Sequence, residues 1–214
     1  MLKITPISES TLVCTLPPPA ELSKQRQFWA FAEALESHIH IAEVVVGMNN
    51  LTVFANFGTN LTALAQQLEQ QWAQIEVGSH HGRHIQIPVQ YGGKWGEDLF
   101  EVAAFHNVSP ETIIERHIAP TYTVFMIGFQ AGFPYLGGLP EHLHTPRRTI
   151  PRTAVPAGSV GIGGSQTGVY PFSSPGGWQL IGRTDLALFN KANNLPTLLQ
   201  AGDTVQFVVD KVEL

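Results

Sequence analysis

Two spacings of hydrophobic residues alternate along residues 1–90. Runs of β-branched and other apolar residues predict strands, and apolar residues three or four positions apart predict helices. In chain order the predicted elements are strands 2–7 and 11–16, helix 21–38, strands 41–46 and 51–57, helix 59–75 and strand 83–89. The order β-α-β-β-α-β within this stretch is that of a ferredoxin-like α+β domain, which we expect at residues 1–88.

The pattern changes in residues 89–214, where helical spacing disappears after Gly128. Twelve of the 20 glycines and seven of the 15 prolines lie between Gly128 and Gly182. The elements predicted here are helices 97–105 and 110–118, a strand at 121–127, and short strands at 154–155, 160–162, 178–181 and 204–209. Short strands with many glycine corners predict a small closed β-barrel, so the whole chain is expected to be of the α+β class.

The composition is that of a folded protein, because 43% of the 214 residues are hydrophobic and 14% are charged. A net charge of −5 argues against a general binder of nucleic acid or of anionic membranes. The single cysteine, Cys14, lies in an apolar run, which predicts a buried thiol and a reducing compartment. No apolar run reaches the roughly 18 residues of a membrane span, so we expect a soluble, cytoplasmic protein.

Charge is distributed unevenly along the chain. Residues 142–184 contain no Asp or Glu but four arginines, namely Arg147, Arg148, Arg152 and Arg183. Because a guanidinium binds carboxylate or phosphate through two parallel hydrogen bonds, the stretch is a candidate anion site. The alternative is that these arginines pair with acids elsewhere in the chain, such as Glu97, Asp98 or Asp185.

A glycine-rich segment at residues 160–168 is a second candidate. It has neither the order of a Walker loop nor that of a dinucleotide fingerprint. Its glycines would let backbone N–H groups converge on an anion or a developing oxyanion, with side-chain donors beside them. The residues concerned are Gly163, Gly164, Ser165, Gln166 and Thr167. On the glycines alone, a tight β-turn between two barrel strands is the open alternative.

Aromatic residues interleave with glycine in the same half of the chain. Phe129, Phe133 and Tyr135 follow Gly128, and Trp178 follows a second glycine pair. These rings either form a wall that faces a ligand or a partner, or they belong to the barrel core. The histidine clusters 80–84 and 142–144 lack a matching set of zinc ligands, so no metal site is expected. His117 ends a predicted helix and is interpreted as a partner of the helix dipole.

Six segments, read together, resemble one family. They are Val89–Leu99, Gly128–Leu136, Thr145–Arg148, Pro151–Val160, Gln166–Pro171 and Ser174–Thr184. In this length and order the chain is similar to the B subunits of 5-oxoprolinase, the family of KipI and of allophanate hydrolase subunit 1. Small departures occur at Gln130-Ala131 and at Ser165. The resemblance implies an N-terminal α+β domain and a cyclophilin-like β-barrel, for which residues 89–214 are expected.

The resemblance also implies an activity and partners. The family acts in the ATP-dependent opening of 5-oxoproline to glutamate, with Mg²⁺ implied, beside a KipA-type C subunit and a LamB/YcsF-type A subunit. Such chemistry needs groups that stabilise anions. We expect Arg147, Arg148 and Gln166 to be catalytic and the segment Gly163, Gly164, Ser165 and Thr167 to bind substrate. Tyr91 and Asp98 form a further candidate polar pair, with a role in bracing a loop as the alternative.

Other functions remain open from the sequence. KipI is an inhibitor of a sensor histidine kinase, and on that reading Phe129, Phe133, Tyr135 and Trp178 would line a groove for a protein helix. A third possibility is one half of a carboxyltransferase-like amidolyase that acts on urea-type substrates. The chain contains no biotin-carrier segment, which makes the third reading the weakest.

Overall fold

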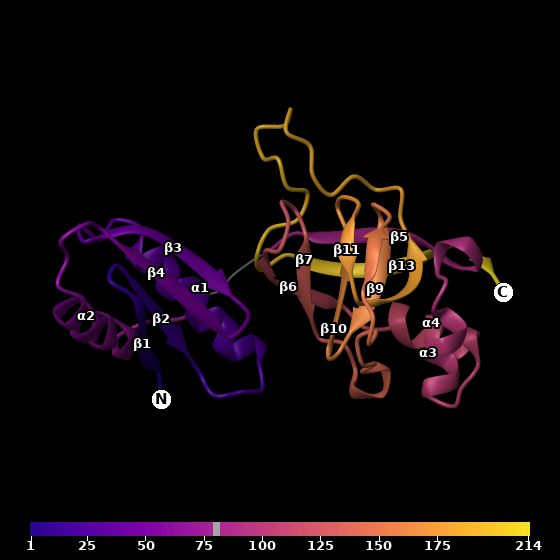
Figure 1. The fold of residues 1–214 in the computed structure, drawn as a ribbon, viewed down its shortest axis with the longest axis horizontal. Helices are drawn as coiled ribbons and strands as arrows, with labels where there is room; N and C mark the ends of the chain where they lie inside the picture. The colour runs from indigo at the N-terminus through magenta and orange to yellow at the C-terminus, as the bar shows by residue number, and fades with distance from the viewer. Residues whose placement is uncertain (79–81) are drawn as a thin grey trace. The chain divides into compact units, whose positions relative to one another are not determined.

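The computed structural model describes residues 1–78 and 82–214. The chain divides into two compact units, Met1–His80 and His81–Leu214 (Figure 1). The boundary expected between residues 88 and 89 falls inside strand β5, His84–Gly92, which belongs as a whole to the second unit. Each unit has its own hydrophobic core.

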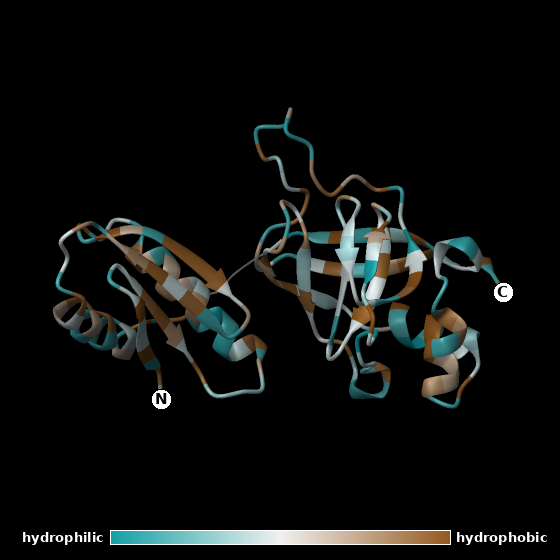
Figure 2. Cartoon of the chain, in the orientation of Figure 1, coloured by the Kyte–Doolittle hydropathy of each residue, from teal (hydrophilic) through white to brown (hydrophobic). Residues whose placement is uncertain are grey.

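The N-terminal unit is a four-stranded antiparallel sheet with two helices. Its elements are β1 (Lys3–Ser8), β2 (Thr11–Thr15), α1 (Leu22–Leu35), β3 (Ile41–Gly47), β4 (Asn50–Ala55) and α2 (Leu61–Ala73), and the strand order is β1-β2-β4-β3. Side chains from both helices and from the strands share one core, and Figure 2 colours the hydrophobic stretches of the chain brown. Cys14 is fully buried in this core, and burial raises the pKa of its thiol to about 12, which confirms the predicted buried thiol.

Local signals placed these elements correctly. The predicted hairpin closes through Met48 and Asn49, with Gly47 paired to Asn50 and Asn49 in the left-handed region at φ 59°. Asn residues tolerate that conformation better than most others, which suits this turn. Helix α2 begins at Leu61, two residues after the predicted start, because the side chain of Asn60 caps it and accepts hydrogen bonds from the N–H groups of Thr62 and Ala63.

The expected ferredoxin-like order is not found. Strand β5 does not close the N-terminal sheet; both of its edges are occupied in the barrel, by β13 (Thr204–Glu213) in parallel and by β12 (Gln179–Arg183) in antiparallel orientation. Its residues Ile87 and Val89 are fully buried in the barrel core. The N-terminal unit instead uses β1 as its fourth strand, so its chain order is β-β-α-β-β-α.

The second unit is a closed seven-stranded barrel, as the glycine and proline pattern predicted. Its remaining strands are β6 (Tyr122–Ile127), β7 (Pro134–Gly137), β9 (Ser159–Gly163) and β10 (Gln166–Val169), and the order around the barrel is β10-β7-β6-β13-β5-β12-β9. A separate two-stranded sheet pairs β8 (Arg152–Val155) with β11 (Ser174–Gly176). The parallel pairing of β13 with β5 joins the two ends of the unit and closes the barrel.

Short helices cover the barrel at one end. They are η1 (Gly93–Trp95), α3 (Leu99–Phe105), α4 (Pro110–Ile118) and η2 (Glu141–Leu143). Helix α4 has the predicted bounds, with Ser109 accepting from the N–H of Thr112 and Pro110 in the first turn. The apolar faces of α3 and α4 join the barrel core through Leu99, Val102, Ile113 and Ile114. No helix in the described ranges is long and apolar enough to cross a membrane.

Candidate active site

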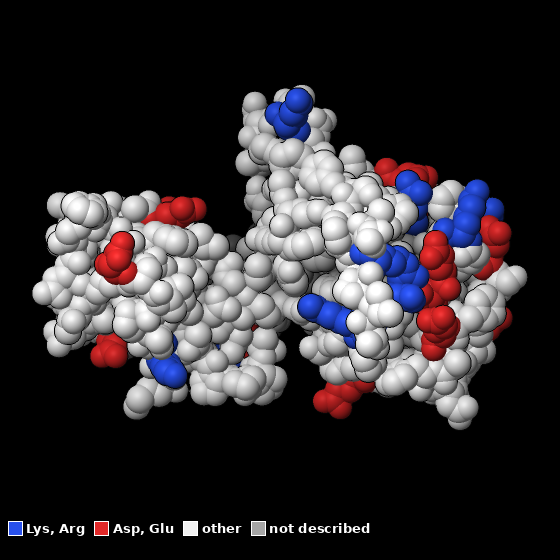
Figure 3. All heavy atoms as spheres, viewed as in Figure 1, with Lys and Arg blue, Asp and Glu red and all other residues white. Residues whose placement is uncertain are grey.

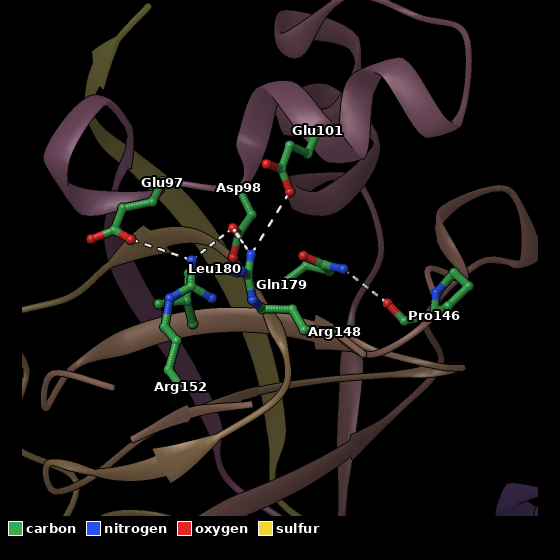
Figure 4. A network of polar contacts seen from close by, with 8 residues as sticks. All are labelled: Glu97, Asp98, Glu101, Pro146, Arg148, Arg152, Gln179 and Leu180. Carbon is green, nitrogen blue, oxygen red and sulfur yellow. Dashed lines mark hydrogen bonds and ion pairs between the residues drawn. The ribbon is translucent and has the colours of Figure 1, made fainter. Parts of the chain in front are cut away.

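The carboxylate of Asp98, just before α3, is bonded by two arginines. Its Oδ1 atom accepts from Arg148 Nη1 at 2.9 Å and from Arg152 Nη2 at 2.7 Å. Its Oδ2 atom accepts from the backbone N–H of Leu180 at 2.6 Å, and the Asp98 N–H donates to the Leu180 carbonyl. The side chain is only 2% exposed. We call Asp98, Arg148 and Arg152 the carboxylate brace (Figure 4).

Two more exposed acids lie near the arginines of this brace and add negative charge beside them. Glu97 lies 3.2 Å from Arg152 Nη2, and Glu101 lies 3.8 Å from Arg148 Nη1. Hydrogen bonding to Asp98 is the main cause that raises the pKa of Arg152. The blue and red side chains that lie side by side on the barrel unit in Figure 3 reflect this kind of pairing. Arg148 and Arg152 are therefore neutralised by the chain itself.

The brace fixes the segment that runs from Thr145 to Arg152. Besides its side-chain bonds, Arg148 donates its backbone N–H to the Gly177 carbonyl at 2.7 Å. Two residues earlier, the Pro146 carbonyl accepts from Gln179 Nε2 at 3.0 Å. Arg147, between these two anchors, is thus held on a rigid segment. A groove of about 510 Å³ follows the segment and is lined on its other side by Glu101, Val102 and Phe105 of α3.

Aromatic side chains form a second, smaller hollow, which we call the aromatic pocket. It has a volume of about 270 Å³ and is lined by Phe129, Phe133, Tyr135, Arg147, Pro151, Tyr170, Pro175, Gly176, Gly177 and Trp178. Phe133 is at its centre, with ring centroids of Tyr135, Tyr170 and Trp178 at 5.1, 5.2 and 5.5 Å. The Tyr170 and Trp178 rings meet Phe133 edge to face and the Tyr135 ring is tilted against it, and such contacts stabilise the array beyond simple burial.

Arg147 is the cation of this pocket. Its guanidinium carbon lies 5.8 Å from the centroid of the Trp178 ring, within the range of a cation–π contact. Among the described residues, no carboxylate lies within ion-pairing distance of Arg147, whereas Arg148 and Arg152 share Asp98. Arg147 is also exposed to solvent. It therefore offers an uncompensated guanidinium to an anion that enters the pocket.

Phe129 is strained at the mouth of the same pocket. Its φ is 63°, in the left-handed region that costs a non-glycine residue roughly 1–3 kcal/mol. The side chain is nevertheless 61% exposed, so burial does not compensate this cost in the isolated chain. Its ring lies 5.5 Å from that of Phe133. A strained, exposed aromatic residue beside a pocket is typical of a side chain that contacts a ligand or partner.

The glycine-rich segment is a tight hairpin. Gly163 of β9 pairs with Gln166 of β10, and Gly164, at φ +67°, makes the turn with Ser165. The N–H of Gly164 donates to the Thr145 carbonyl at 2.8 Å, so this donor is already used. A Cβ atom on Gly163 would lie 2.5 Å from the Trp178 ring. The glycine at 163 thus makes room for the indole of the aromatic pocket.

A chain of hydrogen bonds crosses the barrel interior. Tyr91 Oη lies 2.8 Å from His117 Nδ1, His117 Nε2 lies 2.9 Å from Thr167 Oγ1, and Thr167 Oγ1 donates to the Gly161 carbonyl at 3.0 Å. Since the only hydroxyl proton of Thr167 goes to Gly161, His117 Nε2 must donate and Nδ1 must accept from Tyr91. His117 is completely buried, and burial lowers its pKa to about 3. It is a neutral link in the core, not the cationic dipole partner that its position in the sequence suggested.

Comparisons with known proteins match the entire chain. The model of the carboxyltransferase domain family, subdomains C and D, matches residues 2–199. A protein of Haemophilus influenzae that is named as the B subunit of 5-oxoprolinase is 65% identical over 213 residues, which cover 100% of both chains. A second protein of that name, from Escherichia coli O157:H7, is 48% identical over 96% of this chain and 94% of its own.

The chain belongs to the family of 5-oxoprolinase B subunits. Among solved structures, TTHA0988 superposes with a TM-score of 0.81 at 31% identity. The match covers 94% of this chain but only 40% of TTHA0988, so the chain spans about two fifths of that longer protein. The likeness supports the arrangement of an α+β unit followed by a barrel in this member of the 5-oxoprolinase family.

In the structure of this family member, the site residues predicted from the sequence lie in different places. Arg147 and the four rings Phe129, Phe133, Tyr135 and Trp178 line one pocket, although Phe133 and Trp178 are also buried as core residues are. Arg148 pairs with Asp98, which is the ion-pairing alternative. Gly163, Gly164, Ser165 and Gln166 form the hairpin, with Ser165 exposed and Gln166 half-buried.

The expected pair of Tyr91 and Asp98 is divided between two networks. Tyr91 is bonded to His117 in the barrel interior, and Asp98 is bonded to the arginines of the brace. Thr167 is fully buried and belongs to the chain that includes His117. Asp98 thus has the bracing position that the sequence left as an alternative. No group of three potential metal ligands is placed together among the described residues, and His80 and His81 lie outside them.

Two further residues of this region were not among the individual site residues predicted from the sequence, although Arg152 was named as one of the four arginines of the acid-free stretch. Tyr170 lines the aromatic pocket, and Arg152 supplies half of the carboxylate brace. The signal for Tyr170 was present, since it opens a second aromatic and glycine-rich run at residues 170–178. The signal for Arg152 was the charge asymmetry, but nothing local distinguished it from Arg147 or Arg148. Only the closed barrel brings it to Asp98.

Removing the shared carboxylate should destabilise the barrel. We predict that Asp98→Ala lowers the free energy of unfolding by about 3 kcal/mol, because two arginines lose their common partner. Urea unfolding at neutral pH measures the change. Asp210→Ala, at an exposed position of β13, is the matched control and should cost less than about 0.5 kcal/mol. Equal losses in the two variants would show that the brace contributes nothing special.

His117 should make stability depend on pH. The pKa of its imidazole is 6.5 in the unfolded chain and about 3 in the fold, so the unfolded chain binds more protons between these values. Stability is therefore full above pH 6.5 and falls as the pH decreases, by about 1 kcal/mol from pH 7 to pH 5.5. His117→Gln should remove this part of the pH dependence, whereas His142→Gln, at an exposed site, should keep it. An unchanged dependence in His117→Gln would contradict the assignment.

Proposed function

We propose that this chain is one subunit of an ATP-dependent 5-oxoprolinase, which opens 5-oxo-L-proline to L-glutamate. The observation that carries the proposal is the 65% identity, over the full length of both chains, to a protein named as the B subunit of 5-oxoprolinase. Because that relative is named as a subunit, it is expected to act together with further chains. From the family resemblance we infer two partners for this chain, a KipA-type C subunit and a LamB/YcsF-type A subunit, and we expect the chain alone to be inactive.

The reaction explains why anion-binding groups are needed. Water adds to the lactam carbonyl carbon, the C–N bond breaks, and the nitrogen takes up a proton to become the amine of glutamate. A lactam is resonance-stabilised and resists this attack, and coupling to ATP supplies the driving force. The substrate carries a carboxylate, and the addition step creates an oxyanion, so positive groups stabilise both substrate and transition state. The uncompensated guanidinium of Arg147 supports this reading.

Neither the glycine-rich hairpin nor the aromatic pocket fits a nucleotide. The N–H of Gly164, the donor of the glycine turn, is bonded to Thr145 rather than free for a phosphate. Within residues 1–78 and 82–214, no cluster of acids or histidines could hold a magnesium ion. At about 270 Å³, the aromatic pocket falls below the usual range for drug-sized ligands. We therefore assign the binding of ATP and Mg²⁺ to the assembled complex.

Reconstitution tests the proposal directly. We predict that this chain, mixed with its A and C partners, releases glutamate from 5-oxoproline only when ATP is present, and that each single omission abolishes the release. The product is measured with a coupled glutamate dehydrogenase assay. The physical reason is that, in the proposed complex, one chain activates the lactam with ATP and another supplies the residues that bind anions.

Two controls make the result decisive. A mixture without this chain tests whether the partners alone suffice, and unchanged glutamate release in it would refute the proposal. Autophosphorylation of the sensor histidine kinase, assayed with and without the chain, tests the alternative function suggested by KipI. Strong inhibition of the kinase together with no glutamate release would favour that alternative.

A further inference from the structure

We propose that the aromatic pocket binds 5-oxoproline itself, with the ring against the aromatic wall and the carboxylate at Arg147. This assignment rests on the proposed function, and it moves substrate binding away from the glycine-rich hairpin. The observation behind it is a single juxtaposition. An uncompensated guanidinium and five aromatic rings, one of them the strained and exposed Phe129, meet at one small hollow.

The size of the pocket suits a compact ring. Its volume is about 270 Å³, just below the ~300 Å³ at which pockets for larger ligands begin. A nucleotide or a helix of a partner protein would need a longer groove. A five-membered lactam with one carboxylate fills such a space and leaves room for a few water molecules. The dimensions of the aromatic pocket therefore favour the small substrate over a nucleotide or a helix as its occupant.

The wall has the chemistry that a five-membered ring requires. The two faces of the ring are largely apolar and pack favourably on aromatic surfaces. The array around Phe133 is rigid, because backbone glycines leave the space that its neighbours fill. A Cβ on Gly168 would lie 3.3 Å from Phe133, and one on Gly176 would lie 2.5 Å from the Tyr170 hydroxyl. A preformed pocket of this kind loses little entropy when it binds a rigid ligand.

Polar groups of the pocket can orient the substrate. Arg147 offers parallel N–H donors that match a carboxylate. The phenols of Tyr135 and Tyr170 line the same pocket as Arg147. Burial raises the pKa of each phenol, so both keep their protons at neutral pH. Either hydroxyl can then donate to the lactam oxygen while Arg147 holds the carboxylate.

Arg147 is also held in place. The segment on one side is anchored by Pro146, whose carbonyl binds Gln179, and on the other by Arg148, which binds Asp98. The indole under the guanidinium is fixed because Gly163 leaves room for it. The cation is consequently preorganised, and binding the carboxylate does not require the segment to fold around the ligand.

Ligand analogues provide the test. Binding of 5-oxoproline and of 2-pyrrolidinone, which lacks the carboxylate, is measured by ligand-observed NMR on the full-length chain, alone and with the KipA-type partner. We predict that Arg147→Gln weakens 5-oxoproline binding about ten- to a hundredfold and leaves 2-pyrrolidinone unchanged, because only the carboxylate contacts this side chain. Phe129→Asn, which suits a left-handed backbone but removes the ring, should weaken both ligands.

Arg26→Gln is the matched control, since Arg26 is an exposed arginine of α1 in the other unit, and it should change neither ligand. Equal binding of 5-oxoproline by the wild-type and Arg147→Gln chains would overturn the inference. So would the absence of binding to the wild-type chain both alone and with the KipA-type partner. Continued glutamate release by the three-protein mixture in either case would leave the proposed function standing. The predicted NMR pattern without glutamate release would instead support the pocket and refute the function.

Discussion

The carboxylate of Asp98 is buried where three stretches of the barrel unit meet. It accepts hydrogen bonds from Arg148 and Arg152 of one stretch and from the backbone of Leu180 on β12, while Asp98 itself precedes α3. A buried carboxylate is stable in such a position because charged and backbone donors compensate its loss of water, here two guanidinium groups and one backbone N–H. Conversely, two arginines can sit close together only because this carboxylate lies between them.

The arginines at residues 147–152 therefore have different roles in the site, although the sequence does not distinguish them. Arg148 and Arg152 are used to fix the segment, and Arg147 is left without an acid and points to the aromatic pocket. Of the three arginines at residues 147–152, Arg147 keeps an open guanidinium beside the rings, and Arg183, the fourth of the stretch, lies over the ring of Trp95. Because the anchors are on either side of Arg147, its position depends on the brace although it does not touch Asp98.

Local signals in the sequence were sufficient for most elements. Capping by Asn60 and Ser109 fixed the starts of α2 and α4, and the density of glycine and proline indicated a barrel. The pattern of residues 83–89 was equally compatible with either sheet. Its assignment to the barrel depends on pairing with β13, more than a hundred residues away, and no local signal reports such a partner.

The same limit applied to the site. The sequence indicated that arginines, glycines and aromatic rings matter between residues 128 and 183, and the pocket contains members of each class. It did not indicate that Gly163 serves Trp178, or that Thr167 belongs with His117 and Tyr91 in the barrel interior. Those relations arise from strands that become neighbours only when the barrel closes. The composition of the sequence therefore indicated the region of the site, whereas the role of each residue follows from the strand pairing in the barrel.

Asp98, through the carboxylate brace, positions Arg147 over the pocket, and a crystal structure of the Asp98→Ala chain is the experiment that shows whether it does. We expect the segment around Arg147 to shift in this variant, so that the guanidinium no longer lies over the Trp178 ring, from which it is now 5.8 Å away. If Arg147 instead keeps its place over Trp178, its position does not depend on Asp98.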